Sequence, residues 1–85
     1  MKIVDNTKDF KIIAIDRITM AEKLNSPGIC DTCNTPAGLG YWVAVLNCWL
    51  CPDCFQDWYD NATNYPEDRA IENAYFERMK QILGL

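Results

Sequence analysis

The sequence predicts a small single-domain α+β protein, with strands in its first half and helices in its second. Three observations predict this class. The chain has 85 residues, the size of one domain. Short runs of β-branched and aromatic residues recur in the chain up to residue 50. From residue 51 onward, the apolar residues recur at helical spacing.

Residues 1–28 are expected to form an N-terminal hairpin and a short helix. Residues 2–4 and 10–15 are rich in isoleucine and valine, and the intervening Asp and Asn residues favour a turn. Thr19 and Glu22 have the spacing of a capping box, which predicts a helix over residues 20–24.

Residues 39–46 form the most strand-like segment, and residues 48–50 are expected to return beside it after a turn at Asn47. Both faces of the first strand are apolar, because Tyr41, Val43 and Val45 alternate with Trp42, Ala44 and Leu46. This strand must therefore be covered on both sides, or keep one face for a partner.

A first helix is expected to begin after Cys51, with this residue as N-cap and Pro52 at the first helical position. Its apolar face comprises Phe55, Trp58, Tyr59 and Ala62. Residues 63–85 are expected to form the C-terminal amphipathic helix, which starts at Pro66 and ends before Gly84. Its expected buried stripe comprises Ile71, Ala74, Tyr75, Met79, Ile82 and Leu83.

The cysteines form two C-x2-C pairs seventeen residues apart, and this spacing is typical of a tetrahedral four-cysteine metal site. A core this small contributes only about 3–5 kcal/mol, so a structural metal is expected. We predict one structural Zn²⁺, bound by Cys30, Cys33, Cys51 and Cys54. Disulfides are disfavoured because the number of cysteines is odd and no secretion signal is seen. The remaining alternative is that the cysteines are small buried hydrophobic residues.

Cys48 is the odd cysteine, and it also forms a C-x2-C pair with Cys51. Residues three apart on a strand point to opposite faces of the sheet. Cys48 is therefore expected to point away from the metal and to be a buried hydrophobic residue.

Residues 29–62 resemble the treble-clef zinc fingers, in which a CxxC knuckle and a β-hairpin precede a second CxxC that opens a helix. The chain also resembles small zinc-finger proteins of bacteria and phages. The resemblance implies a treble-clef-like fold and four thiolate ligands, but no particular function. Rubredoxin, an iron protein, is a more distant match, because its knuckles usually continue with glycine where this chain has Asn34 and Phe55.

The formal net charge is −4, and residues 51–85 hold seven acids against three bases. Nucleic-acid binding is disfavoured because it draws on clustered lysine and arginine. Apolar runs are too short to cross a membrane, so we expect no membrane partner and a cytoplasmic location. The chain has no histidine, which removes the commonest general base, and we expect that it is not an enzyme.

The expected function is that of a zinc-binding protein–protein interaction or regulatory module. The acidic second half and the aromatic-rich hairpin favour a protein partner. A nucleic-acid-binding zinc finger is the first alternative. A thiol redox or metal-sensing protein is the second, with Cys48 as the spare thiol. A homodimer is possible if the C-terminal helix or residues 39–46 leave an apolar face uncovered.

Overall fold

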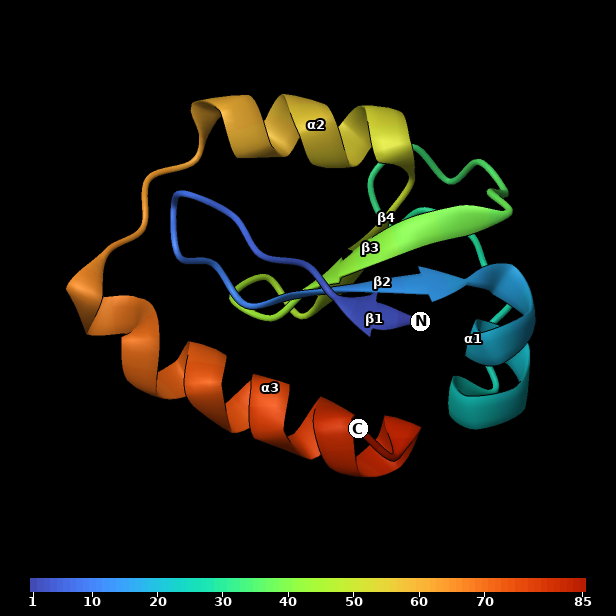
Figure 1. The fold of residues 1–85 in the computed structure, drawn as a ribbon. Helices are drawn as coiled ribbons and strands as arrows, with labels where there is room; N and C mark the ends of the chain where they lie inside the picture. Colours follow the sequence, from blue (N-terminus) through green and yellow to red (C-terminus); the bar gives the residue numbers. More distant parts are fainter.

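In a computed structural model that describes residues 1–85, four antiparallel strands lie in one sheet in sequence order (Figure 1). The predicted α+β class is confirmed. The strands are β1 (Lys2–Ile3), β2 (Ile12–Asp16), β3 (Leu39–Val43) and β4 (Cys48–Leu50). The helices are α1 (Arg17–Leu24), α2 (Pro52–Asn61), the 3₁₀ turn η1 (Pro66–Asp68) and α3 (Arg69–Leu83).

The sheet separates α2 from α3, which lie on its opposite sides in Figure 1. Alternate residues of β3 therefore enter different cores. Trp42 belongs to the larger cluster, which includes Phe76 of α3, whereas Val43 belongs to a smaller cluster that packs against α2. This arrangement explains the two apolar faces of β3, because both are covered.

The start of α1 differs from the prediction. The helix begins at Arg17, and its N-cap is Asp16 instead of Thr19. The Asp16 carboxylate accepts hydrogen bonds from the Thr19 N–H at 3.0 Å and from the Thr19 hydroxyl at 2.6 Å. Asp16 ends β2 and is itself a strong N-cap residue, so the helix starts without any intervening loop.

The hairpin between β3 and β4 has a longer turn than predicted. β3 ends at Val43, and residues 44–47 form the turn. The Asn47 N–H donates to the Ala44 carbonyl at 3.1 Å, and Asn47 has a left-handed φ of 52°. Asparagine tolerates this conformation better than most residues.

The buried face of α3 is rotated relative to the prediction. Ile71, Ala74 and Ile82 are exposed, whereas Glu72 and Phe76 are buried together with Leu83. Apolar residues occupy two adjacent rows of this helix, and the row that includes Phe76 faces the sheet. Glu72 can occupy this row because its carboxylate accepts the Lys11 N–H at 3.1 Å. The prediction is correct for Leu83, and for Tyr75 and Met79, which are half-buried.

Candidate metal centre

The first cysteine pair lies in a tight loop between α1 and β3. The Asn34 N–H donates to the Cys30 carbonyl at 2.9 Å, and the Cys30 N–H donates to the Thr35 carbonyl at 3.0 Å. Asn34 has a left-handed φ of 60°, which reverses the chain after Cys33. The loop thus returns both thiols to the same side.

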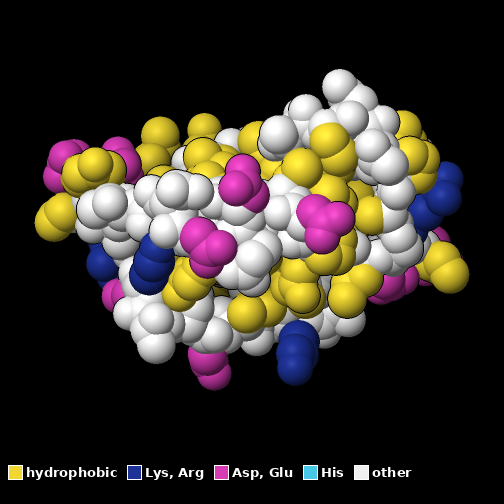
Figure 2. All heavy atoms as spheres, turned by 90° about the horizontal axis from the view of Figure 1, so that it is seen from above, with side chains coloured by type: hydrophobic (Ala, Val, Ile, Leu, Met, Phe, Trp, Pro, Cys, Tyr) yellow, Lys and Arg dark blue, Asp and Glu magenta, His cyan; other side chains and the backbone are white.

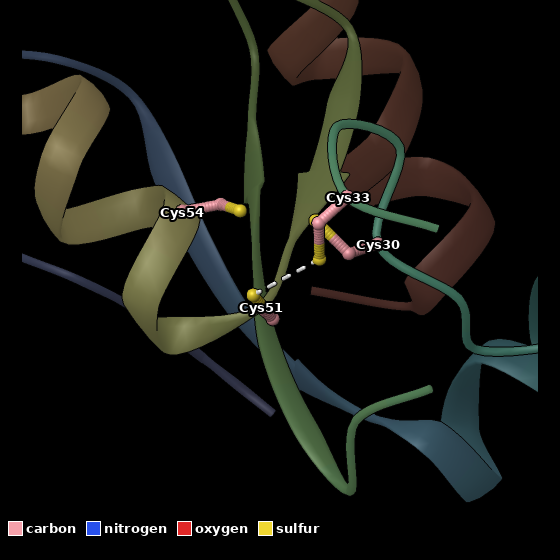
Figure 3. A group of neighbouring side chains, drawn as sticks. All are labelled: Cys30, Cys33, Cys51 and Cys54. Carbon is pink, nitrogen blue, oxygen red and sulfur yellow. Dashed lines mark hydrogen bonds between the residues drawn. The ribbon is translucent and has the colours of Figure 1, made fainter. Parts of the chain in front are cut away.

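The second pair lies where β4 passes into α2. Cys51 is the N-cap of α2 and Pro52 the first helical residue, as predicted. The Cys51 side chain makes no capping hydrogen bond, so its sulfur is available to bind a metal ion. Cys54 follows in the first helical turn, and its side chain points back towards the loop of the first pair (Figure 3).

The four sulfur atoms of these two pairs lie within 4.8 Å of one another and could hold a metal ion. The Cys33 and Cys51 sulfurs lie 3.8 Å apart (Figure 3). Cys30 is fully buried and Cys33 is exposed, so the cluster extends from the core to the surface. The structure therefore brings together all four of the residues predicted as ligands.

Cys48 lies outside this cluster, as its position on β4 predicts. Its thiol donates to the Leu46 carbonyl at 3.3 Å, and the side chain is half-buried. Burial raises the pKa of Cys48, and the negative charges of Asp31 and Cys30 raise it further. Cys48 is thus a protonated thiol at neutral pH.

The thiols of the cluster differ in acidity. Burial acts to raise the pKa of Cys30, but hydrogen bonds from the backbone amides of Cys33, Cys51 and Thr32 outweigh it and lower the pKa to about 6. Hydrogen bonding to the Cys51 and Cys33 side chains raises the pKa of Cys54 to about 12. A thiolate thus forms readily at Cys30, whereas Cys54 keeps its proton until a cation replaces it.

Asp31 connects the two cysteine pairs, and it was not among the residues predicted for the site. Its N–H donates to the Trp49 carbonyl at 3.0 Å, and its carboxylate accepts the Trp49 N–H at 2.9 Å. These bonds attach the first loop to the outer edge of β4, two residues before Cys51. The only signal in the sequence is the position of this aspartate directly after Cys30, and this position alone does not identify a partner on β4.

Comparisons with protein-family models, with curated proteins and with solved structures found no match for this chain. No helix combines the length and the apolar composition that crossing a bilayer requires. The interpretation of the site therefore depends on its geometry and its donor atoms.

Proposed function

We propose that this chain is a zinc protein in which Cys30, Cys33, Cys51 and Cys54 hold one structural Zn²⁺. The convergence of the four sulfurs within 4.8 Å carries this proposal. Tetrahedral zinc with Zn–S bonds of about 2.3 Å requires sulfurs about 3.8 Å apart. The Cys33–Cys51 separation of 3.8 Å matches this value. When bound, the metal supplies a structural cross-link.

The order of elements supports a treble-clef interpretation of residues 29–62. A CxxC loop is followed by the β3–β4 hairpin, and the second CxxC pair opens α2. An iron site with the same ligands is the competing assignment. Native mass spectrometry and elemental analysis of the purified protein distinguish the two, because zinc gives a colourless protein with one Zn²⁺ per chain.

The role that fits this site best is that of a protein–protein interaction or regulatory module. Four protein ligands complete the tetrahedral shell of zinc and leave no position for a substrate, which argues against catalysis. The acids of the second half would repel nucleic-acid phosphates and attract a basic protein surface. A zinc site of four thiolates requires reduced cysteines, which favours a reducing compartment such as the cytoplasm.

Affinity capture from the native host with the zinc-loaded protein tests this role, with excess untagged protein as the competitor. We expect a protein partner that the competitor displaces. A parallel titration uses single- and double-stranded oligonucleotides at about 0.15 M salt, where non-specific binders show dissociation constants of about 10⁻⁴–10⁻⁶ M. Sub-micromolar oligonucleotide binding would overturn the interaction role in favour of a nucleic-acid-binding zinc finger.

A further inference from the structure

A surface hollow of about 290 Å³ lies between the β3–β4 turn, the end of α2 and the segment that leads to α3. Two of its apolar side chains remain largely open to solvent, since Leu46 is 42% exposed and Tyr65 is 52% exposed. The Trp58 and Phe10 rings pack against each other beneath them, with centroids 4.8 Å apart. The apolar residues of the hollow are Phe10, Val45, Leu46, Trp58, Ala62 and Tyr65.

An acidic row leads along α2 to this hollow. Asp53, Asp57 and Asn61 are four residues apart, so they follow one another on the helix surface, and Asn61 lines the hollow. Asp60 is also exposed on α2. Asp68, which follows α2 in the chain and belongs to η1, lines the hollow as well. Figure 2, which looks down on α2, shows acidic side chains spaced over this face with hydrophobic side chains beside them.

These acids have no neutralising partner. Residues 51–68 contain five acids and no lysine or arginine, and none of the five forms an ion pair. Two cations lie near this end of α2. Lys8 donates to the Tyr59 and Ala62 carbonyls at the end of α2, and Arg69 pairs with Asp9 at 2.8 Å. Lys8 offsets one negative charge at most and Arg69 is already paired, so the five acids leave a net negative charge around the hollow.

We propose that this hollow is the docking site for a basic amphipathic peptide segment of a partner protein. An apolar side chain of the segment would enter between Leu46 and Tyr65, and its lysine or arginine residues would face the acids of α2. This inference depends on the proposed interaction role. A second copy of the same surface is a poor occupant because it would bring the same acids against this one.

A short amphipathic peptide of lysine and leucine is the probe. It is titrated at about 0.15 M salt into the isotope-labelled zinc-loaded protein, and backbone amide chemical shifts are recorded. We expect the shifts to cluster at residues 45–46 and 57–65. A peptide with serine in place of leucine tests the apolar contribution and should bind much more weakly. A peptide with glutamate in place of lysine should not bind.

Surface variants test which acidic residues contribute to peptide binding. The double variant Asp57→Asn/Asp60→Asn should weaken peptide binding about tenfold. The control Glu22→Gln/Glu77→Gln removes the same charge from α1 and α3 and should bind like the parent chain. If both double variants weakened peptide binding equally, the effect would come from the net charge of the protein alone, and the proposal would be overturned. Shifts centred elsewhere, or a dimer in light scattering that covers residues 45–46 and 57–65, would also overturn it.

The host capture experiment separates this proposal from the interaction role itself. If the Asp57→Asn/Asp60→Asn variant captures the same partner in the same amount, and the same concentration of competitor displaces it as from the parent chain, the docking site is wrong and the role stands. If no displaceable partner is captured but the peptide binds at the hollow, the interaction role fails while the surface keeps its preference for basic segments.

Discussion

The two faces of the sheet are stabilised by different means. The face towards α3 has a cluster of eight buried residues, among them Ile13, Trp42, Trp49 and Phe76. The face towards α2 has a smaller buried cluster, Cys30, Val43 and Leu50, with cysteines and partly buried aromatic residues around it, and Ile12 and Ala14 of β2 are buried on the same face. Both faces thus bury apolar side chains, but only the face towards α2 also carries four converging thiols. A bound metal would add a cross-link on this second face, whose contiguous buried cluster is the smaller of the two.

Removal of the metal should have the largest effect. A structural zinc site contributes on the order of 10 kcal/mol of apparent binding free energy. A strong chelator should therefore abolish the cooperative thermal transition, as followed by circular dichroism. Cys51→Ser and Cys54→Ser should do the same without chelator. Amide exchange should show that α2 and the first cysteine loop lose protection before β2. A metal-free protein that keeps a cooperative transition would contradict this comparison.

Truncation on the other face should be the next largest effect. Phe76 is only 7% exposed, so Phe76→Ala should lower the free energy of unfolding by about 3–5 kcal/mol. Ile71→Ala on the same helix is the matched control, since Ile71 is 52% exposed and its loss should change stability by less than about 0.5 kcal/mol. Denaturant titration of the metal-loaded protein measures both. Equal losses of stability in the two variants would mean that α3 packs against the sheet through the row that contains Ile71.

Asp31 offers a sharper test of the face towards α2, because it lies next to Cys30 and is not one of the four proposed ligands. Asp31→Ala removes the acceptor of the Trp49 N–H and loosens the first loop on β4. We expect zinc affinity to fall about 10–100-fold, as measured with a competing chelator. Asp31→Asn keeps an acceptor and should recover much of the loss. The cobalt-substituted spectrum should stay tetrahedral in both variants, and a changed spectrum would indicate direct ligation.

Cys48→Ser should have the smallest effect. Cys48 lies outside the sulfur cluster, so one zinc per chain should remain. Elemental analysis of the purified variant measures this, with Cys51→Ser as the comparison. Zinc loss from the Cys48 variant would show that Cys48 and Cys51 form the second pair, and that the start of α2 is not the metal-binding element.

Local patterns predicted the features that depend on neighbours in the chain. The cysteine spacing identified the four thiols that converge, and the parity of a strand placed Cys48 apart from them. The aromatic residues Trp42 and Trp49 are buried, as expected for so small a domain. The helix start at Pro52 follows from the ring of proline, which suits the first turn.

Features that depend on distant contacts could not be predicted in this way. The orientation in which α3 follows η1 determines which of its two rows faces the sheet. The burial of Glu72 depends on a hydrogen bond from the Lys11 N–H. The role of Asp31 depends on the first loop lying beside β4, eighteen residues away. No local pattern contains these partners.

Trp49 connects the core on the α3 side with the cysteine loop. Its indole N–H donates to the Ile15 carbonyl at 3.1 Å within the core on the α3 side, while its backbone exchanges hydrogen bonds with Asp31 beside the thiols. Gly40 leaves room for the ring, since a Cβ there would overlap it. If a metal binds, we therefore expect its occupancy and the packing of this core to be linked reciprocally through Trp49. The intrinsic fluorescence of this indole should consequently report metal loading from the opposite side of the sheet.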